Sequence, residues 1–377
     1  MTSYAGGPKS GLMILLLWGI PEVVLGAKFD MRPGVTEMSE RIQQIHHMGL
    51  WICVVVGIIV FGAMFYSMFA HRRSRNPTPA TFTDSTLVEF IWTLIPVLIL
   101  IGMAIPATTA LRDIEDNENS DLTVLITASQ WKWHYKYLAS GISYYSNIST
   151  PQEQIDNLEP KDEFYLLDVD KPLVLPTNKK IRFLVTADDV IHSWWVPDFA
   201  VKQDAIPGFI NEAWARIPVV GVFRGQCAEL CGLKHAYMPI VVDVRPEAEF
   251  DAWIEEQRLA AELAGEAAVA ARARTWAMDE LLSIGEDVFT KHCSTCHERD
   301  GMGQGAKYPA LAGSEIATGH IADHLARVMD GKADSEMQAW APQLSDLEIA
   351  AVLTYERNSW GNDTGDIIQP LTVYEAR

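Results

Sequence analysis

The chain has 377 residues and carries a formal charge of −19 at neutral pH. Its length allows two or three folded units, and its apolar content excludes a disordered or collagen-like chain. The acidic balance argues against a nucleic-acid partner, because phosphate binding needs clustered Lys and Arg, and it favours a basic protein partner. Five cysteines are too few for a disulfide scaffold of this size, so the paired ones suggest metal or cofactor attachment.

An uncharged run at residues 11–21 follows Lys9 near the N-terminus. At about 1.5 Å of rise per residue, this run is too short for a secure membrane span. We interpret residues 1–27 as a signal peptide or N-terminal segment, and an interfacial or short N-terminal helix is the alternative.

Two longer uncharged runs predict a transmembrane hairpin within residues 28–114. Residues 49–70 and 90–111 are each long enough to cross a hydrocarbon core of about 30 Å. The loop between them carries Arg72, Arg73 and Arg75, so the positive-inside rule places this loop in the cytoplasm. We therefore expect a two-pass protein of a bacterial inner membrane, with everything after residue 111 on the periplasmic side.

Glu89 stands at the cytoplasmic start of the second span. A charge costs about 2.5–3.5 kcal/mol at the bilayer centre but less near an interface. The residue can therefore be an interfacial anchor or a carboxylate that collects protons, and its position alone leaves both roles open.

Residues 115–246 predict an all-β unit. Short runs rich in Val, Ile, Leu and aromatic residues alternate with turn residues, at 122–127, 163–169, 173–175, 181–185, 212–217 and 240–244. Short strands at such spacing are typical of a sandwich or barrel. No helix longer than one turn is expected in this unit.

Soft metal-binding side chains gather in the second half of this unit, at His192, Cys227, Cys231, His235 and Met238. Thiolates, imidazoles and a thioether select copper over magnesium or calcium. Two thiolates four residues apart can bridge two copper ions that share one electron, with one imidazole for each ion. Met238 and the backbone carbonyl of Glu229 are the candidates for the weak extra ligands. An ordinary disulfide between the two cysteines is the alternative.

Several motifs of this chain resemble cytochrome c oxidase subunit II. The matching stretches are Cys227-Ala228-Glu229-Leu230-Cys231-Gly232 with His235 and Met238, His192-Ser193-Trp194, Gln130-Trp131-Lys132-Trp133, and residues 87–96 of the second span. The resemblance implies a cupredoxin fold, a dinuclear copper A centre, and oxidase subunit I with other oxidase subunits as partners.

The resemblance also implies roles for three side chains. Glu229 would give its carbonyl to copper and its side chain to a magnesium ion shared with subunit I. Trp131 would lie where electrons enter, although the alternation of Trp131 and Trp133 also allows either indole simply to pack the core. Glu89 would lie at the entrance of a proton channel. Many relatives have Tyr where this chain has Lys132, a departure beside the surface on which a donor docks.

A second redox unit follows a helical linker at residues 247–280, which strong helix formers dominate. Cys293-Ser294-Thr295-Cys296-His297 is the attachment signature for haem c, within a unit at residues 281–363. The two thiols would add to the vinyl groups, and His297 would ligate the iron. A thioredoxin-like redox pair is the alternative. Residues 364–377 form a tail without a readable signal.

The haem iron needs a second axial ligand. Met337, in a loop before the capping box Ser345-x-x-Glu348, is the preferred residue, and Met329, in a predicted helix at 320–329, is the alternative. A thioether ligand would raise the haem potential. Residues 308–313 resemble the class I cytochrome c stretch whose proline carbonyl accepts the N–H of the axial histidine.

The three units together resemble subunit II of a caa-type oxidase. A c-type cytochrome, soluble or membrane-bound, would reduce haem c, copper A would follow, and subunit I would reduce oxygen to water with proton translocation. No candidate oxygen-reducing centre remains in the sequence after these ligands are assigned. A subunit of a copper-A nitric oxide reductase and a membrane-anchored copper chaperone are the alternatives.

Overall fold

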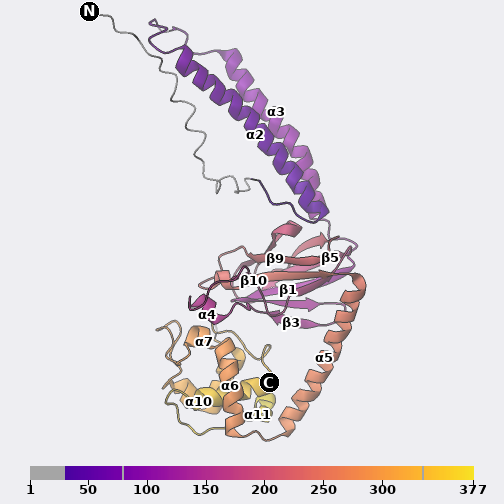
Figure 1. Cartoon of the computed structure of the whole chain (residues 1–377), viewed down its shortest axis with the longest axis vertical. Coiled ribbons are helices and arrows are strands. Elements are labelled where there is room, and N and C mark those ends of the chain that lie inside the picture. The colour runs from indigo at the N-terminus through magenta and orange to yellow at the C-terminus, as the bar shows by residue number, and fades with distance from the viewer. Residues whose placement is uncertain (1–29, 79, 333–334) are drawn as a thin grey trace, which may run out of the picture.

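The computed structural model describes residues 30–78, 80–332 and 335–377. A pair of long helices, a β-sandwich and a unit of short helices follow one another along the chain (Figure 1). The predicted N-terminal segment at residues 1–27 lies outside the described residues.

The two long helices, α2 (Glu37–Ala70) and α3 (Thr86–Ile114), run side by side and project away from the sandwich (Figure 1). Each contains one predicted span, is long and apolar enough to cross a membrane, and leaves its apolar side chains exposed. A helix satisfies its backbone groups internally, as a lipid environment requires. The hairpin therefore indicates a membrane-anchored protein.

The hairpin is fastened to the sandwich at one end. Arg32, just before α2, forms an ion pair with Asp198 at 2.9 Å. At the end of α3, the carbonyl of Asp113 accepts a hydrogen bond from the indole of Trp214 at 3.0 Å. Both helices are thus joined to the same side of the sandwich.

The β-sandwich, residues 122–245, consists of two five-stranded sheets. The first has the order β3 (Ser143–Ser146), β2 (Lys132–Tyr137), β1 (Leu122–Ser129), β5 (Lys180–Ala187), β8 (Asn211–Arg216). The second has the order β4 (Leu173–Pro176), β10 (Pro239–Arg245), β9 (Gly221–Cys227), β6 (His192–Val196), β7 (Val201–Ala205). The pairs β1–β5 and β4–β10 are parallel and the other pairs are antiparallel.

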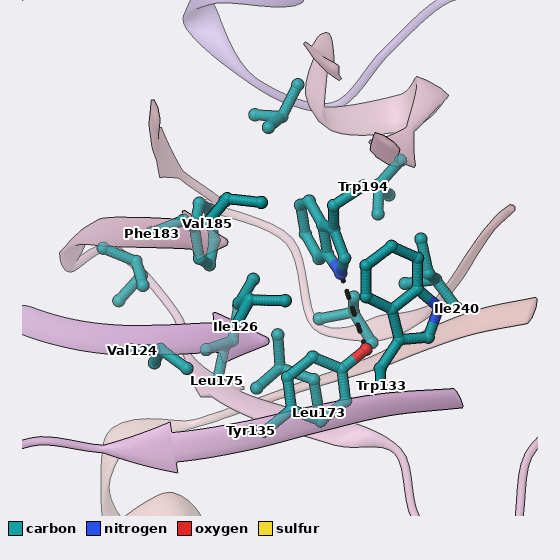
Figure 2. Close-up of a cluster of buried hydrophobic side chains, with 14 of the residues drawn as sticks. Val124, Ile126, Trp133, Tyr135, Leu173, Leu175, Phe183, Val185, Trp194 and Ile240 are labelled. Atoms are coloured by element: carbon teal, nitrogen blue, oxygen red, sulfur yellow. Dashed lines mark hydrogen bonds between the residues drawn. The ribbon is translucent and has the colours of Figure 1, made fainter. Parts of the chain in front are cut away.

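Aliphatic and aromatic side chains from both sheets meet between them (Figure 2). Trp133 of β2 and Trp194 of β6 are completely buried, and the Trp194 indole N–H lies 3.5 Å from the Tyr135 hydroxyl. Trp194 follows His192 by two residues on the same strand, so this packing fixes the strand that carries the predicted ligand.

Five of the six predicted strands are present, but the strand predicted at residues 163–169 is wrong. The Asp162 carboxylate accepts the backbone N–H of Phe164 at 2.9 Å, and Leu166 has a left-handed φ of 58°. An aspartate that bonds the backbone two residues on is typical of a turn. The structure also adds β2, β3, β6, β7 and β9, and its one α-helix there, α4 (Gln152–Ile155), is one turn long.

A long helix, α5 (Glu247–Ala273), joins the sandwich to the helical part of the chain (Figure 1). Its first turns pack on the sandwich, where the Trp253 ring lies 5.4 Å from the Tyr137 ring. Its last turn reaches the other unit, where Arg272 forms an ion pair with Asp346 at 3.1 Å. The predicted helical linker is therefore present, and both its ends are held.

The described residues of the helical unit, 278–332 and 335–377, form six helices: α6 (Met278–His292), α7 (Ser294–His297), α8 (Glu315–Thr318), α9 (Ile321–Asp330), α10 (Asp346–Arg357) and α11 (Pro370–Ala376). The predicted capping box is present, since the Ser345 hydroxyl accepts the Glu348 N–H at 3.2 Å. Helix α11 lies in the stretch without a sequence signal, and its Val373 is buried in the core of this unit.

Candidate metal and haem sites

The predicted copper ligands come together at one end of the sandwich. His192 begins β6, Cys227 ends β9, Cys231 lies in the following loop, and His235 and Met238 lie at a short 3₁₀ turn, η2 (His235–Tyr237). Ligand atoms of His192, Cys227 and Cys231 all lie within 4.8 Å of one another.

Both sulfur atoms of the cysteine pair face the other ligands. The Cys231 Sγ atom lies 3.4 Å from His235 Nδ1 and 3.6 Å from Met238 Sδ. The two Sγ atoms are 3.9 Å apart and both cysteines are free, so the structure has no disulfide here. Two sulfurs with an imidazole on either side fit a pair of soft metal ions.

Hydrogen bonding prepares the pair for metal binding. The hydrogen bond with Cys231, with His192 also contributing, lowers the pKa of Cys227 to about 3. The pKa of Cys231 is raised by the same hydrogen bond. A lowered thiol pKa favours metal binding at Cys227, because metals bind thiolates.

Asp189 orients the buried histidine ligand, and sequence reasoning missed it. Its carboxylate lies 2.9 Å from His192 Nε2, so the other ring nitrogen, Nδ1, faces Met238 Sδ at 3.3 Å. A carboxylate on the second ring nitrogen fixes the tautomer and orientation of a metal-binding histidine. The only sequence signal for this role is that Asp189 stands three residues before His192.

The two tryptophans of the Trp-x-Trp motif have different surroundings. Trp133 is fully buried, and its indole N–H donates to the Met238 carbonyl at 3.1 Å. Trp131 is half-buried, and its indole N–H donates to the Cys231 carbonyl at 3.2 Å. Gly232 permits this approach, because a Cβ there would lie 3.1 Å from the Trp131 ring. Trp131 therefore contacts the backbone of a candidate copper ligand.

The remaining predicted residues of the membrane and copper units lie at the surface. The Glu229 carbonyl is 3.3 Å from Cys227 Sγ, while its side chain is exposed beside the exposed Leu230. Glu89 lies exposed in the first turn of α3. Both side chains are therefore accessible at the surface of the chain.

A cavity of about 730 Å³ lies beside the haem attachment motif and is lined by Cys293, Cys296, His297 and Met337. His297 Nδ1 lies 2.9 Å from the Pro309 carbonyl, which is the hydrogen bond that the resemblance implied. This bond leaves the other ring nitrogen free to bind iron. Two thiols and an oriented imidazole on one cavity fit a covalently attached haem.

The two candidate methionines differ in position. Met337 lines the cavity, whereas Met329 lies on α9, is buried in the core of the helical unit and is absent from the cavity wall. The arrangement therefore favours Met337 over Met329 as the residue that faces His297.

The sandwich closes one side of this cavity. Trp131, Lys132, Asn147, Lys234 and Tyr237 all line it, opposite the residues of the helical unit. Trp131 thus stands between the haem cavity and the Cys231 carbonyl. This juxtaposition depends on how the two units pack, and no local pattern in the sequence could have predicted it.

The family comparisons divide the chain into the same three regions. Residues 25–109 match the family described as cytochrome c oxidase subunit II, transmembrane domain, and residues 122–245 match the periplasmic domain of that subunit. Residues 280–355 match the family described as cytochrome c oxidase, cbb3-type, subunit III.

Individual relatives are similar over the first two regions. A probable cytochrome c oxidase subunit 2 from Rickettsia bellii is 36% identical over 244 residues, which are 65% of this chain and 89% of that protein. The subunit 2 of Cereibacter sphaeroides is 38% identical over 241 residues, covering 60% and 79% respectively. The solved periplasmic domain of subunit II from Bradyrhizobium japonicum is 40% identical and covers 37% of this chain and 95% of that chain, with a TM-score of 0.34.

Proposed function

The chain belongs to the cytochrome c oxidase subunit II family and carries an additional cytochrome c domain, and from this we propose that it conducts electrons from a haem c to a dinuclear copper centre and on to subunit I. One observation carries the proposal. Trp131 lines the haem cavity and donates a hydrogen bond to the Cys231 carbonyl, so a single side chain joins the two candidate centres.

The copper cluster has the donors for two ions. Cys227 and Cys231 would bridge them, and His192 and His235 would each bind one. Met238 and the Glu229 carbonyl would supply the weak extra ligands. When bound, such a pair holds a shared electron with little change at each ion. Asp189 would hold His192 in place, and the buried core behind the cluster excludes water from it.

The helical unit supplies the other centre. Cys293 and Cys296 would attach the haem, and His297 and Met337 would bind its iron. The Pro309 carbonyl holds the imidazole by a 2.9 Å hydrogen bond. The fusion keeps both centres on one chain, at an effective concentration that can reach the mM range.

Trp131 is the proposed route between the centres. Its ring forms part of the wall shared by the sandwich and the helical unit, and its N–H is bonded to the ligand loop. A c-type cytochrome, soluble or membrane-bound, would therefore deliver electrons to the helical unit. The half-buried Trp131 ring faces that unit across the shared cavity.

The rest of the proposal concerns the assembled oxidase. The two apolar helices would lie in a bacterial inner membrane, with the sandwich and helical unit on the periplasmic side. The exposed Glu229 side chain would share a magnesium ion with subunit I. Glu89 would admit protons at the other end of the hairpin. Subunit I would reduce oxygen to water and couple this reaction to proton translocation.

Rapid reduction of the purified complex by a c-type cytochrome tests the proposal. Absorbance would be followed separately at the haem c and copper bands. We expect haem c to be reduced first and then to be reoxidised as copper is reduced, with a mixed-valence copper signal in electron paramagnetic resonance. Zinc or a disulfide at Cys227 and Cys231, or a large partner subunit that reduces nitric oxide in place of oxygen, would contradict it.

A further inference from the structure

Lys132 is a buried lysine at the contact between the sandwich and the helical unit. It follows Trp131 at the start of β2, and only 4% of it is exposed to solvent. Lysine is almost never fully buried unless its charge is paired. A lysine buried at this position therefore needs an explanation.

The partners of the Lys132 amine come mainly from the helical unit. Its Nζ atom lies 4.5 Å from the centre of the Trp340 ring and donates a hydrogen bond to the Gln343 side chain. The Tyr145 ring of its own sheet lies farther away, at 5.4 Å. Among the described residues no carboxylate forms an ion pair with this amine.

Both partners belong to the loop that carries Met337. Trp340 and Gln343 follow Met337 within six residues, and the Trp340 backbone N–H donates to the Val328 carbonyl of α9 at 3.1 Å. The Gln343 amide is bonded to the Ala339 carbonyl at 3.1 Å. Lys132 of the sandwich therefore contacts a part of the cavity wall that hydrogen bonds within the helical unit hold in place.

Such a contact favours one orientation more than it favours tight binding. Burial lowers the pKa of Lys132 to about 7, which shows that the amine loses more by leaving water than its neighbours return. In any other docked orientation the amine would be buried without Trp340 and Gln343, at a larger cost. A buried polar group used in this way selects a geometry at the expense of affinity.

We propose that Lys132 is a positioning residue that sets the orientation of the helical unit on the sandwich and so keeps Trp131 against the haem cavity. The consequence for electron transfer rests on the proposed function, whereas the orientation itself does not. Helix α5 keeps the two units near each other, but the contact at Lys132 lies at a separate place and adds a second constraint on their relative rotation.

Distance measurements on the full chain test the orientation directly. Nitroxide labels would be attached at the exposed positions Ser140 and Asp363, in a Cys53→Ser background, after copper and haem have been loaded. Pulsed electron paramagnetic resonance should give one narrow distance for the wild-type pair. Lys132→Met should give a broad or double distribution, and Lys132→Arg, which keeps N–H donors that can reach the Gln343 side chain, should restore the narrow one.

A control and a second variant keep the result interpretable. Lys136→Met removes an exposed lysine from the same strand and should leave the distribution unchanged. Gln343→Leu removes the acceptor from the opposite unit and should broaden the distribution as Lys132→Met does. It therefore replaces that variant if the copper spectrum shows that Lys132→Met has not folded. An unchanged narrow distribution in the folded Lys132 variant, or in its Gln343 replacement, overturns the proposal.

Electron transfer from haem c to copper is the second readout. A small misplacement of reacting groups can cost up to about a hundredfold in rate, so we expect Lys132→Met to slow this step by about tenfold. The haem and copper spectra should stay unchanged. Absence of transfer in the wild-type protein would defeat the proposed function, while the distance distributions would still decide the role of Lys132.

Discussion

At the scale of single residues, one carboxylate connects two parts of the candidate copper cluster. Asp189 bonds His192 Nε2 at 2.9 Å and accepts the Gln130 backbone N–H at 2.7 Å. The Gln130 side chain in turn donates to the Cys231 carbonyl at 2.7 Å. A change at Asp189 should therefore reach both an imidazole and a thiolate ligand.

Asp189→Asn should weaken copper binding by about ten- to hundredfold, as expected when the partner of a metal-binding histidine is lost. Copper titration followed by electron paramagnetic resonance measures this effect. Asp188→Asn is the matched control, because the neighbouring carboxylate makes no hydrogen bond to His192 in the structure. Equal affinity of the Asp189 variant and the wild type would refute the orienting role.

The two methionines of the helical unit give a second residue-scale prediction. Met337→Ala should change the haem to a high-spin or alternative low-spin form and lower its potential, because a thioether ligand is lost. Met329→Ala should keep the spectrum but destabilise the unit by about 2–5 kcal/mol, because it opens a cavity in the core. Optical spectra and denaturant unfolding separate these effects, and exchanged results would make Met329 the ligand.

At the scale of elements, helices α6 and α10 approach closely at Gly285. A Cβ there would lie 2.2 Å from the Ala351 carbonyl, so any side chain must push the helices apart. Gly285→Ala should therefore lower the free energy of unfolding of the helical unit by about 1–3 kcal/mol. Denaturant titration followed by circular dichroism measures the change.

Gly265 provides the opposite case on the linker helix. No atom lies within 4 Å of a Cβ built there, and the position is exposed in the middle of α5. Gly265→Ala should stabilise the helix by about 0.5–1 kcal/mol, because glycine loses more backbone entropy than alanine. If Gly265→Ala and Gly285→Ala both lower the free energy of unfolding, crowding is not the reason for the effect at Gly285.

Elements with a local signal were predictable, and those defined by distant contacts were not. The capping box at Ser345 and the apolar stripe after it predicted α10, because both patterns lie within a few residues. Strand β6 was missed because it begins with the polar pair His192-Ser193, although both residues are completely buried in the folded structure. The false strand at 163–169 had strand-like composition, but the Asp162 side chain favours a turn.

The candidate site shows the same division. The spacings Cys-x3-Cys-x3-His and Cys-x-x-Cys-His predicted the cysteines and one histidine of each candidate ligand set, since these residues lie on one short stretch of chain, whereas His192 and Met337 lie far from it. Asp189 and Pro309 act through hydrogen bonds whose partners are fixed by folding, and only the resemblance indicated Pro309. The cavity wall forms only where the sandwich and the helical unit pack together. No local repeat or spacing in the sequence predicts how two units pack.

At the scale of the whole molecule, the contact between the two units should depend on pH. Desolvation lowers the pKa of Lys132 to about 7, although Asp188 and Asp189 face it from the sandwich and raise it. His292 faces it from α6, and its own pKa is lowered to about 4, chiefly by burial. An exposed lysine has a pKa near 10.4. Between pH 7 and about pH 10.4, Lys132 is therefore protonated when the sandwich and the helical unit are separated, and it is neutral when they are in contact.

Docking should therefore tighten as the pH rises from about 7 to about 10, by up to about tenfold per pH unit. The cation–π contact, worth about 2 kcal/mol when desolvated, offsets only part of the burial cost. Cleavage at a protease site inserted near Gly265, followed by measurement of the affinity between the fragments, tests the direction. Lys132→Met should abolish the slope. An affinity that falls with rising pH in the wild type would contradict the linkage.

The position of Trp131 under the helical unit has one further consequence. Because Trp131 is half-buried and faces the cavity between the two units, an external carrier that delivers electrons to the proposed haem would meet the outer surface of the helical unit. Preference for a carrier can therefore change through substitutions on residues 278–377 alone, while the metal cradle and its supporting carboxylate stay as they are. Exchange of this segment between organisms should transplant donor choice without retuning the terminal steps of respiration.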